Sequence, residues 1–514
     1  MNSARARAET VAVTSIRPPF CRVGTTPVAS TPTGSVRSLS DLSRLSTGGG
    51  GWRWYRRRTD SRLAACRHTI GAFGRLKGET VRRNLRPRVP FRVMTMAAAA
   101  LLAVVGLAVA PPSASAAPPP MPLVAPPQLP DNARPVCGPV LPGYVHCDAF
   151  VRTDSAGSDP TDPQEPAAGE PVPSAYRPAD LQDAYGLPSA TAGGGQTVAV
   201  VDAYDDPKAE SDLAVYRAAF GLPPCTTANG CFHKVNQRGE TKNYPAPDRH
   251  WGMEISLDLD MVSAICPRCH IVLWEADQAS QEDLAAAAHL AGCDCTSPAG
   301  TNYGARYVSN SYGGPEAGFS ASVDDSYRSD KGTVYTVSSG DSGYGVEYPA
   351  SSKWVTAVGG TSLLPADNAR GWDEIAWLYG GSGCSTYVAK PAWQHDGGCS
   401  GRSVADVAAV ADPTTGVDMY DSYETVDYNG PWLVNGGTSA ASPIIAGVYA
   451  LGAKVLPGTI PSTYPYAKFT QLNDIVGGTN SFENCSPEYL CNAGPGYDGP
   501  TGYGTPHGVA AFQE

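Results

Sequence analysis

The stretch that most limits how this chain can fold is 435–451, NGGTSAASPIIAGVYAL. Its two glycines permit backbone conformations that are closed to other residues, and Pro443 fits the first turn of a helix, where its missing N–H costs nothing. The residues after Ser439 are apolar on nearly every face, which predicts a buried helix. The stretch therefore predicts a serine on a tight turn at the positive end of a buried helix. That geometry suits a nucleophile, although a Gly-Ser loop capping a core helix would give the same pattern.

Strand and helix signals alternate through the rest of the chain. Continuous apolar runs, typical of strands buried in parallel sheets, are separated by helical segments. This order predicts an α/β fold with a doubly wound, mostly parallel sheet and helices on both faces. Such sheets carry their sites at the carboxyl ends of strands, and Asp202, Asn310, Asp341 and Ser439 lie at or just past such ends. The predicted strands span 193–204, 270–276, 307–314, 332–340 and 354–360, and the predicted helices span 178–188, 207–220, 251–265 and 280–292.

Charge divides the 514 residues into two unlike parts. The first 117 residues hold 19 Lys and Arg against 4 Asp and Glu, whereas the remainder carries a net charge of −26. Met96–Ala110 is an apolar run that follows Arg-rich sequence and precedes Ala-Ser-Ala, the pattern of a secretory signal rather than of a membrane anchor. We therefore expect four regions: a disordered or untranslated extension (1–93), a signal segment with its cleavage site (94–116), a Pro- and Ala-rich linker or short propeptide (117–174), and a folded domain (175–514).

Twelve of the fourteen cysteines follow the expected signal segment. An even number in an exported chain indicates disulfide bonds, and close pairs such as Cys384 and Cys399 fit this. A zinc site at 266–269 and 293–295 is the alternative. The sequence does not settle which cysteines pair.

Glu254 and Asp258 are four residues apart, so on a helix they share one face. Apolar residues on another face would bury this helix and bring both carboxylates into the interior. Neighbouring carboxylates resist double ionisation, which raises a pKa and suits a general base acting on a hydroxyl in acid. A solvated acidic face is the alternative. None of the eight histidines has the setting of a catalytic imidazole, and His146 falls outside the predicted core.

Asp341 follows a predicted buried strand in the sequence SSGDSGYG. A carboxyl group kept protonated there would donate a hydrogen bond to a developing oxyanion, although an aspartate in an ordinary turn gives the same pattern. Asp202 ends another strand, and without a histidine partner we interpret it as structural.

Three motifs occur in one order along the chain: EISLD at 254–258, SGDSG at 339–343 and GTSAASP at 437–443. Together with YPASSKWVTAVGGTS at 348–362, they resemble the motifs of the sedolisins, which are serine-carboxyl peptidases built on a subtilisin-like fold. The resemblance covers about residues 175–514.

The resemblance implies a role for each of four residues. Ser439 would be the nucleophile and Glu254 the general base. Asp258 would orient and support Glu254. Asp341 and the backbone N–H of Ser439 would form the oxyanion hole. Sedolisins usually carry a large folded propeptide, and 117–174 is too short and too rich in proline to be one.

The C-terminal end combines carboxylates with Gly-rich backbone in LNDIVGG (472–478) and NAGPGYDGPTGYGTP (492–506). Hard oxygen ligands of this kind suit calcium, and the lack of thiolate or imidazole argues against zinc. A plain Gly-Asp turn is the alternative. The resemblance implies one Ca²⁺ held by Asp474, Asp498 and the backbone carbonyls of Ile475, Gly494 and Gly496.

The sequence thus predicts a secreted, calcium-stabilised endopeptidase that acts on proteins or peptides at acidic pH. We expect a monomer without nucleic-acid partners and without stable membrane association once the signal is cleaved. Two alternatives remain at this point. One is a secreted binding protein on an inactive peptidase scaffold, and the other is a histidine-dependent subtilisin.

Overall fold

The computed structural model describes residues 132–514 except for 154–171, 173, 294, 318, 329–330 and 425–429. The predictions for 1–93 and 94–116 lie outside the described residues, as does much of 117–174. None of the described helices has the length and apolar character needed to cross a lipid bilayer.

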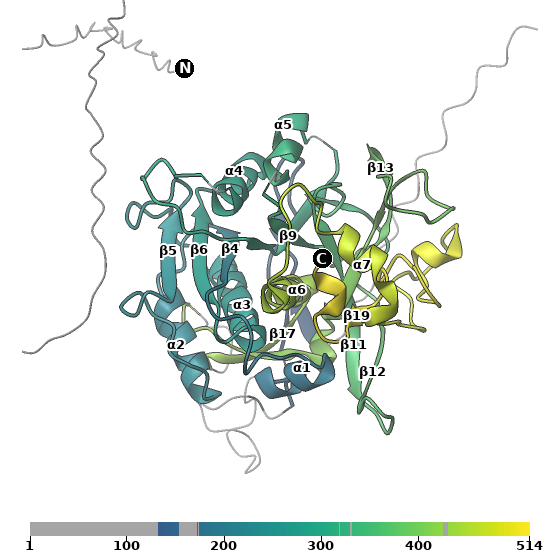
Figure 1. Ribbon diagram of the computed structural model, residues 1–514, viewed down its shortest axis with the longest axis horizontal. Helices are drawn as coiled ribbons and strands as arrows, with labels where there is room; N and C mark the ends of the chain where they lie inside the picture. Colours follow the sequence, from purple (N-terminus) through teal and green to yellow (C-terminus); the bar gives the residue numbers. More distant parts are fainter. Residues whose placement is uncertain are drawn as a thin grey trace, which may run out of the picture. The chain divides into compact units, whose positions relative to one another are not determined.

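An eight-stranded sheet forms the centre of the folded domain (Figure 1). Its strands are β4 Thr197–Ala203, β5 Phe232–Asn236, β6 His270–Ala276, β7 Tyr307–Asn310, β9 Val334–Ser338, β11 Thr356–Pro365, β12 Trp372–Ala376 and β15 Val407–Val410. The order is β12-β11-β9-β7-β4-β6-β5, with β15 also paired to β11. Every pair is parallel except β11 with β12. The predicted mostly parallel sheet is therefore confirmed.

Helices cover both faces of this sheet. They are α1 Pro178–Ala184, α2 Ala209–Ala219, α3 Arg249–Ile265, α4 Gln281–Gly292, α5 Ala321–Asp324, α6 Thr438–Gly452 and α7 Thr463–Ala467. The chain passes from β4 through α2 to β5, back through α3 to β6, and then through α4 across β4 to β7. Helices α3 and α6 pack against each other, and Figure 1 shows them side by side.

Smaller sheets lie beside the central one. Their strands are β1 Ala133–Pro135, β2 His146–Cys147, β3 Phe150–Arg152, β8 Tyr312–Pro315, β10 Glu347–Tyr348, β13 Gly383–Ala389, β14 Gly401–Val404, β16 Val417–Tyr420, β17 Trp432–Gly436, β18 Leu472–Asn473 and β19 Thr505–Pro506. Two of these sheets, β1-β3-β17-β16 and β10-β8-β2, include residues from 132–153, here called the N-terminal arm. This part of the stretch expected to be a linker or short propeptide is thus paired with strands of the folded domain.

The predicted strand 307–314 is wrong as a single element. It divides into β7, in the central sheet, and β8, in a separate antiparallel sheet, with Ser311 between them. The main chain leaves the central sheet because the hydroxyl of Ser311 bonds Asp258 on α3 while β8 pairs with the arm.

Helix α6 begins where the sequence predicted, but Pro443 lies inside it rather than in its first turn. A proline at this place has no N–H to donate to the carbonyl four residues earlier, which belongs to Ser439. That carbonyl lies 3.3 Å from the hydroxyl of Ser311, whose single proton is shared with the nearer oxygens of Asp258. The proline therefore leaves a backbone acceptor open beside Ser311.

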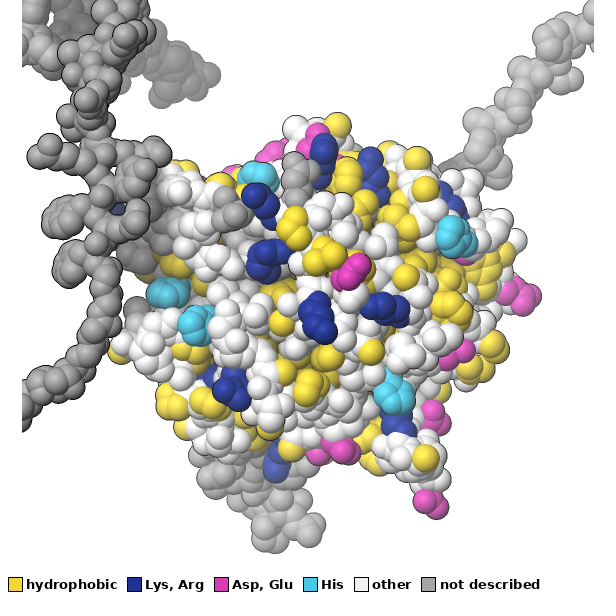
Figure 2. Space-filling view, in the orientation of Figure 1, with side chains coloured by type: hydrophobic (Ala, Val, Ile, Leu, Met, Phe, Trp, Pro, Cys, Tyr) yellow, Lys and Arg dark blue, Asp and Glu magenta, His cyan; other side chains and the backbone are white. Residues whose placement is uncertain are grey.

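The face of the molecule drawn in Figure 2 carries isolated charged side chains among hydrophobic and uncharged ones. Basic side chains form no continuous patch on this face.

Candidate active site

The turn before α6 fixes the position of Ser439. Gly437 precedes the helix with φ of 95°, a conformation that L side chains rarely adopt. A Cβ on this residue would also lie 2.1 Å from the carbonyl oxygen of Asp148, so only glycine fits. The side chain of Ser439 is buried, and its hydroxyl donates to the carbonyl of Ser311 over 3.2 Å.

Helix α3 brings two carboxylates to this serine. The side chain of Asp248 caps the helix by accepting from the N–H groups of His250 and Trp251. Glu254 and Asp258 follow on its buried length, and both are fully buried. The hydroxyl of Ser311 donates to both oxygens of Asp258, over 2.7 and 2.9 Å.

Burial raises the pKa of Glu254 well above its usual value, and the nearby charges of Asp258 and Asp202 raise it further. The hydroxyl of Ser439 opposes this rise, which shows that the two side chains are neighbours. Within the described part of the chain, neither carboxylate oxygen of Glu254 has a hydrogen-bond partner, because the hydroxyl of Ser439 is turned toward Ser311. Glu254 is thus a buried carboxyl group with free acceptor capacity beside a serine.

Burial also raises the pKa of Asp258 well above its usual value, helped by the charge of Asp202 and opposed by hydrogen bonds from Ser311 and Ser309. Asp202 is itself fully buried, and burial raises its pKa to about 8. The sequence suggested a structural role for Asp202, whereas in the structure its charge acts on both carboxylates of α3.

Asp341 follows β9 and meets the start of α6. Its Oδ1 accepts hydrogen bonds from the N–H of Thr438 over 2.7 Å and from the hydroxyl of Thr438 over 2.8 Å. Its Oδ2 has no hydrogen-bond partner among the residues that the structure describes. Burial raises the pKa of Asp341 well above its usual value, with a further rise from Asp148 and opposition from Thr438. A protonated Asp341 would therefore carry its proton on the unpaired oxygen.

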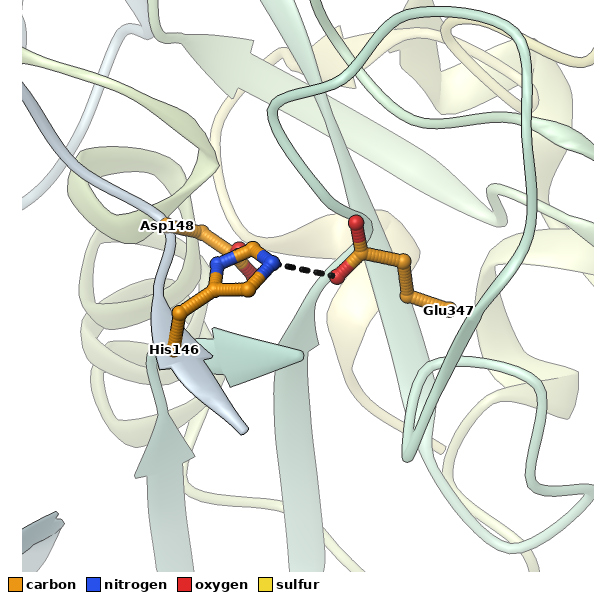
Figure 3. Close-up of side chains that lie close together, drawn as sticks. All are labelled: His146, Asp148 and Glu347. Carbon is orange, nitrogen blue, oxygen red and sulfur yellow. Dashed lines mark ion pairs between the residues drawn. The ribbon is translucent and has the colours of Figure 1, made fainter. Parts of the chain in front are cut away.

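His146, Asp148 and Glu347 form a cluster beside these groups, with the imidazole between the two carboxylates (Figure 3). Nδ1 of His146 lies 3.2 Å from Asp148, and Nε2 lies 3.9 Å from Glu347. Burial alone would lower the pKa of His146, but Asp148 and Glu347 raise it to about 10. Burial and the charge of Asp148 raise the pKa of Glu347 to about 8, against the effect of His146.

Among the described residues, these three side chains are the one set of at least three His, Cys, Asp or Glu groups close enough to hold a metal ion. The raised pKa of His146 keeps its imidazole protonated, and a protonated imidazole is not a metal ligand. The protonated imidazole itself supplies the positive charge that a metal ion would otherwise bring to the two carboxylates. The sequence placed His146 outside the core, and the structure corrects this: it is at the site, although no described histidine is hydrogen-bonded to Ser439.

The residues suggested for calcium lie on two adjacent loops at the C-terminal end. Asp474 accepts from the N–H of Gly496 over 3.0 Å, and Asp498 accepts from the N–H of Gly494 over 3.0 Å. The charge of Asp474 contributes to raising the pKa of Asp498 to about 7, although burial is the larger cause. Two carboxylates that repel each other among backbone oxygens fit a hard cation. Ile475 is buried next to Asp474.

All twelve cysteines of the folded part lie in disulfide-bonded pairs. These are Cys137–Cys147, Cys225–Cys231, Cys266–Cys269, Cys293–Cys295, Cys384–Cys399 and Cys485–Cys491. Pairing of Cys266 with Cys269 and of Cys293 with Cys295 leaves no free thiolates for the alternative zinc site.

The structure therefore gathers Ser439, Glu254, Asp258 and Asp341 around the start of α6. Sequence reasoning missed two features of the site. One is Ser311, which is hydrogen-bonded to Asp258 and to Ser439. The other is the N-terminal arm. A small polar residue between two strand signals is the one sequence hint of the role of Ser311. The arm gave no such signal, because its strands are only two or three residues long.

Fold and site together define a class: a subtilisin-like α/β protein in which a buried serine lies beside carboxylates instead of an imidazole. A model of the Subtilase family matches residues 262–475. Kumamolisin from Bacillus sp. (strain MN-32) is 32% identical over 381 residues, which is 66% of this chain and 64% of kumamolisin. Sedolisin from Pseudomonas sp. (strain 101) is 32% identical over 203 residues, 34% of this chain and 33% of sedolisin.

Human tripeptidyl-peptidase 1 is 29% identical over 217 residues, 34% of this chain and 36% of that protein. The chain thus spans less than two thirds of the length of each of these relatives. The solved structure of Pseudomonas sedolisin, a serine-carboxyl proteinase complexed with pseudo-iodotyrostatin, superposes with a TM-score of 0.54 at 25% identity, over 66% of this chain and 96% of that one. The chain is therefore similar to members of the sedolisin family in sequence and in fold.

Proposed function

We propose that this protein is a serine-carboxyl endopeptidase that cleaves proteins or peptides through an acyl-enzyme on Ser439. The observation that carries the proposal is Glu254, a fully buried carboxyl group without a hydrogen-bond partner among the described residues, which is near enough to Ser439 for that hydroxyl to oppose the rise of its pKa. A serine needs a base to attack a carbonyl, and no described imidazole is bonded to it. Glu254 is the one neighbour that meets this need.

In this mechanism Ser439 attacks the scissile carbonyl while Glu254 takes its proton. Asp258, held at both oxygens by Ser311, keeps Glu254 in place and shares its proton equilibrium. The N–H of Ser439 and the protonated Oδ2 of Asp341 stabilise the oxyanion. Glu254 then returns the proton to the leaving amine, and water hydrolyses the acyl-enzyme.

Acidic pH follows from the protonation states that these roles require. Glu254 must be ionised while Asp341 remains protonated. The raised pKa of Asp341 keeps the proton on Oδ2, and the hydroxyl of Ser439 lowers the pKa of Glu254 against the rise that burial and Asp258 cause. The net charge of −26 after residue 117 also favours acid, where protonation relieves repulsion among carboxylates.

We further propose that one Ca²⁺ is held by Asp474, Asp498 and the carbonyls of Ile475, Gly494 and Gly496. Calcium there would stabilise two loops without taking part in the reaction. Export is supported by six disulfide pairs in the folded part together with the signal-like segment 94–116. We expect a monomer in solution.

The test uses the full chain and its Ser439→Ala variant, assayed on casein at pH 3–8. We expect acid-dependent hydrolysis by the unaltered chain and a loss of about a million-fold in the variant. Ser322→Ala, an exposed serine on α5, serves as the matched control and should keep full activity. Hydrolysis that survives Ser439→Ala, or a folded chain with no hydrolysis at any pH, would contradict the proposal and favour a binding protein.

A further inference from the structure

Asp258 lies at one end of a row of buried hydroxyl groups that no step of the proposed reaction uses. The hydroxyl of Ser309 bonds Asp258 and lowers the pKa of that carboxyl group. The same hydroxyl lies 3.1 Å from that of Ser442, which donates to the hydroxyl of Thr336 over 3.1 Å. Thr336 donates in turn to the carbonyl of Val308 over 3.4 Å. The three hydroxyls thus form a chain from a carboxyl group of the site to a fixed backbone acceptor.

Three elements of the fold bring these hydroxyls together. Ser309 on β7 and Thr336 on β9 are opposite each other in the register of two parallel strands. Ser442 lies on α6, three residues after Ser439, and this helix packs on both strands. All three hydroxyl-bearing residues are fully buried. Each hydroxyl proton therefore needs an acceptor within the protein.

Each hydroxyl has a single proton, which limits the chain to two arrangements. When Asp258 is protonated, it donates to Ser309, Ser309 donates to Ser442, and Ser442 donates to Thr336. When Asp258 is ionised, Ser309 turns to donate to it, and Ser442 turns to donate to Ser309. The geometry of the Ser309–Ser442 bond allows either hydroxyl to be the donor. Thr336 donates to Val308 in both arrangements, so every proton has an acceptor in both protonation states of Asp258.

The charged groups that face Asp258 are acidic. They are Glu254 on the same helix and Asp202 on β4. The other two elements at this place, β7 and α6, contain no charged residue. Arg217 acts on Asp260, on another face of α3, where it lowers the pKa of that carboxyl group. Hydrogen bonds from hydroxyl groups, rather than a cation, therefore favour the charged form of Asp258.

The protonation state of Asp258 controls whether Glu254 is able to act as a base. Two adjacent carboxyl groups resist double ionisation, so in acid Glu254 and Asp258 share one proton. Glu254 accepts the proton of Ser439 only while the shared proton is on Asp258. A donor that always points at Asp258 would keep it ionised and leave the shared proton on Glu254. A chain that turns instead allows Asp258 to hold this proton.

We propose that Ser309, Ser442 and Thr336 are positioning residues that allow Asp258 to hold the proton it shares with Glu254. The proposal rests on the proposed function and adds to its machinery residues that touch neither the substrate nor Ser439. No proton enters or leaves the chain of hydroxyls. Ser309 and Ser442 rotate about their Cβ–Oγ bonds as Asp258 gains or loses the shared proton.

The two ends of the chain predict shifts of opposite sign in the acid limb, the range of pH in which kcat/KM rises with pH. Ser442→Ala leaves Asp258 as the one acceptor for Ser309. Thr336→Val leaves Ser309 as the one acceptor for Ser442, which again turns Ser309 toward Asp258. Both variants favour the proton on Glu254, so the acid limb should move to higher pH by about 0.5–1 unit. Ser309→Ala removes a donor to ionised Asp258 and should move the limb to lower pH.

The test compares the full chain with these three variants on limiting casein at pH 3–8. On the acid limb, kcat/KM should fall about three- to tenfold in Ser442→Ala and Thr336→Val and should recover as pH rises. The matched control is Ser462→Ala, which removes a buried hydroxyl that donates to the carbonyl of Val355 over 2.8 Å. This variant should lose stability without any shift of the pH profile.

The results separate this proposal from the proposed function. An unchanged acid limb in Ser442→Ala and Thr336→Val, a shift of the same sign in Ser309→Ala, or an equal loss at every pH overturns the chain. The proposed function still stands in these cases if Ser439→Ala is inactive. A folded chain that hydrolyses no casein overturns both. Should Ser442→Ala fail to fold, Thr336→Val, which keeps the shape of the side chain, decides the matter.

Discussion

Two groups of buried carboxylates in this chain are held in opposite ways. Asp406 is fully buried and paired with Arg402, also fully buried, and it accepts a further hydrogen bond from Tyr466 over 2.8 Å. Around Ser439, by contrast, no ion pair joins a described Lys or Arg to Glu254, Asp258 or their neighbours Asp202 and Asp341. Burial raises the pKa in both groups, but only at Asp406 does a cation oppose the rise.

The difference teaches what each group is for. A carboxylate that has a cation and full hydrogen bonding remains charged and stabilises its surroundings. Carboxyl groups buried together without a cation hold protons that they exchange with one another, which costs stability and gives acid–base chemistry. The following predictions test this contrast.

The largest expected effect is on catalysis. Glu254→Gln keeps the shape of the side chain but removes the base, so kcat on a peptide substrate should fall by about 10²–10⁴-fold. The fold should remain, because no ion pair is lost among the described contacts. Glu282→Gln, at an exposed position on α4, is the control and should leave kcat unchanged. Full activity in Glu254→Gln would contradict the view that the buried carboxyl groups without a cation serve acid–base chemistry.

Breaking the ion pair between Arg402 and Asp406 should instead lower stability. Arg402→Met leaves Asp406 buried without its cation and should lower the free energy of unfolding by about 3–5 kcal/mol. The control is Arg238→Met, which breaks an exposed pair with Asp277 and should cost about 1 kcal/mol or less. Chemical denaturation measures both. Equal losses of unfolding free energy in the two variants would mean that burial does not increase the contribution of the ion pair to stability.

Stability should fall as pH rises. Burial is the first cause that raises six carboxyl pKa values to about 7 or 8, in Asp202, Asp206, Glu347, Asp418, Asp421 and Asp498. Between pH 4 and pH 8 the folded state therefore binds more protons than the unfolded state, so stability present at pH 4 is lost as pH rises, by about 1.4 kcal/mol per unit for each such group.

Denaturation midpoints at pH 4, 6 and 8 check this sign. Asp421→Asn should make the free energy of unfolding depend less steeply on pH, because one titrating group is removed. A chain that becomes more stable between pH 4 and pH 8 would show that these carboxyl groups are ionised when folded, as Asp406 is beside Arg402.

Calcium should have the smallest effect of the set. At about 100 times its dissociation constant, a bound ion stabilises the folded state by about 2.7 kcal/mol. The melting temperature should therefore fall when a chelator is added, and Asp498→Asn should remove this dependence. Glu483→Gln, exposed on a nearby loop, should retain it. A melting temperature of the unaltered chain that does not depend on calcium would contradict the proposed Ca²⁺ site.

The local part of this account could be predicted from sequence. Apolar runs gave β4 and β6, and the glycine-serine turn gave the start of α6, because these signals depend on neighbouring residues. The four-residue spacing of Glu254 and Asp258 placed both on one helical face. Pro443 was expected in the first turn of this helix and lies beyond it, although the start of α6 was predicted correctly.

The rest depends on contacts between distant parts of the chain. The arm's strands are two or three residues long and exist because β8 and β17 offer free edges. His146 lies at the site only because of that pairing. The break at Ser311 depends on Asp258, 53 positions away. No periodicity in the sequence reports such pairings.

The most direct test of the central claim is the pH dependence of kcat/KM on a peptide substrate, measured for the unaltered chain and for Glu254→Gln. We predict a bell on the acid side of neutrality, rising as Glu254 loses its proton and falling as Asp341 loses its proton, with the variant inactive throughout. An optimum above about pH 7 that survives Glu254→Gln would contradict carboxylate catalysis.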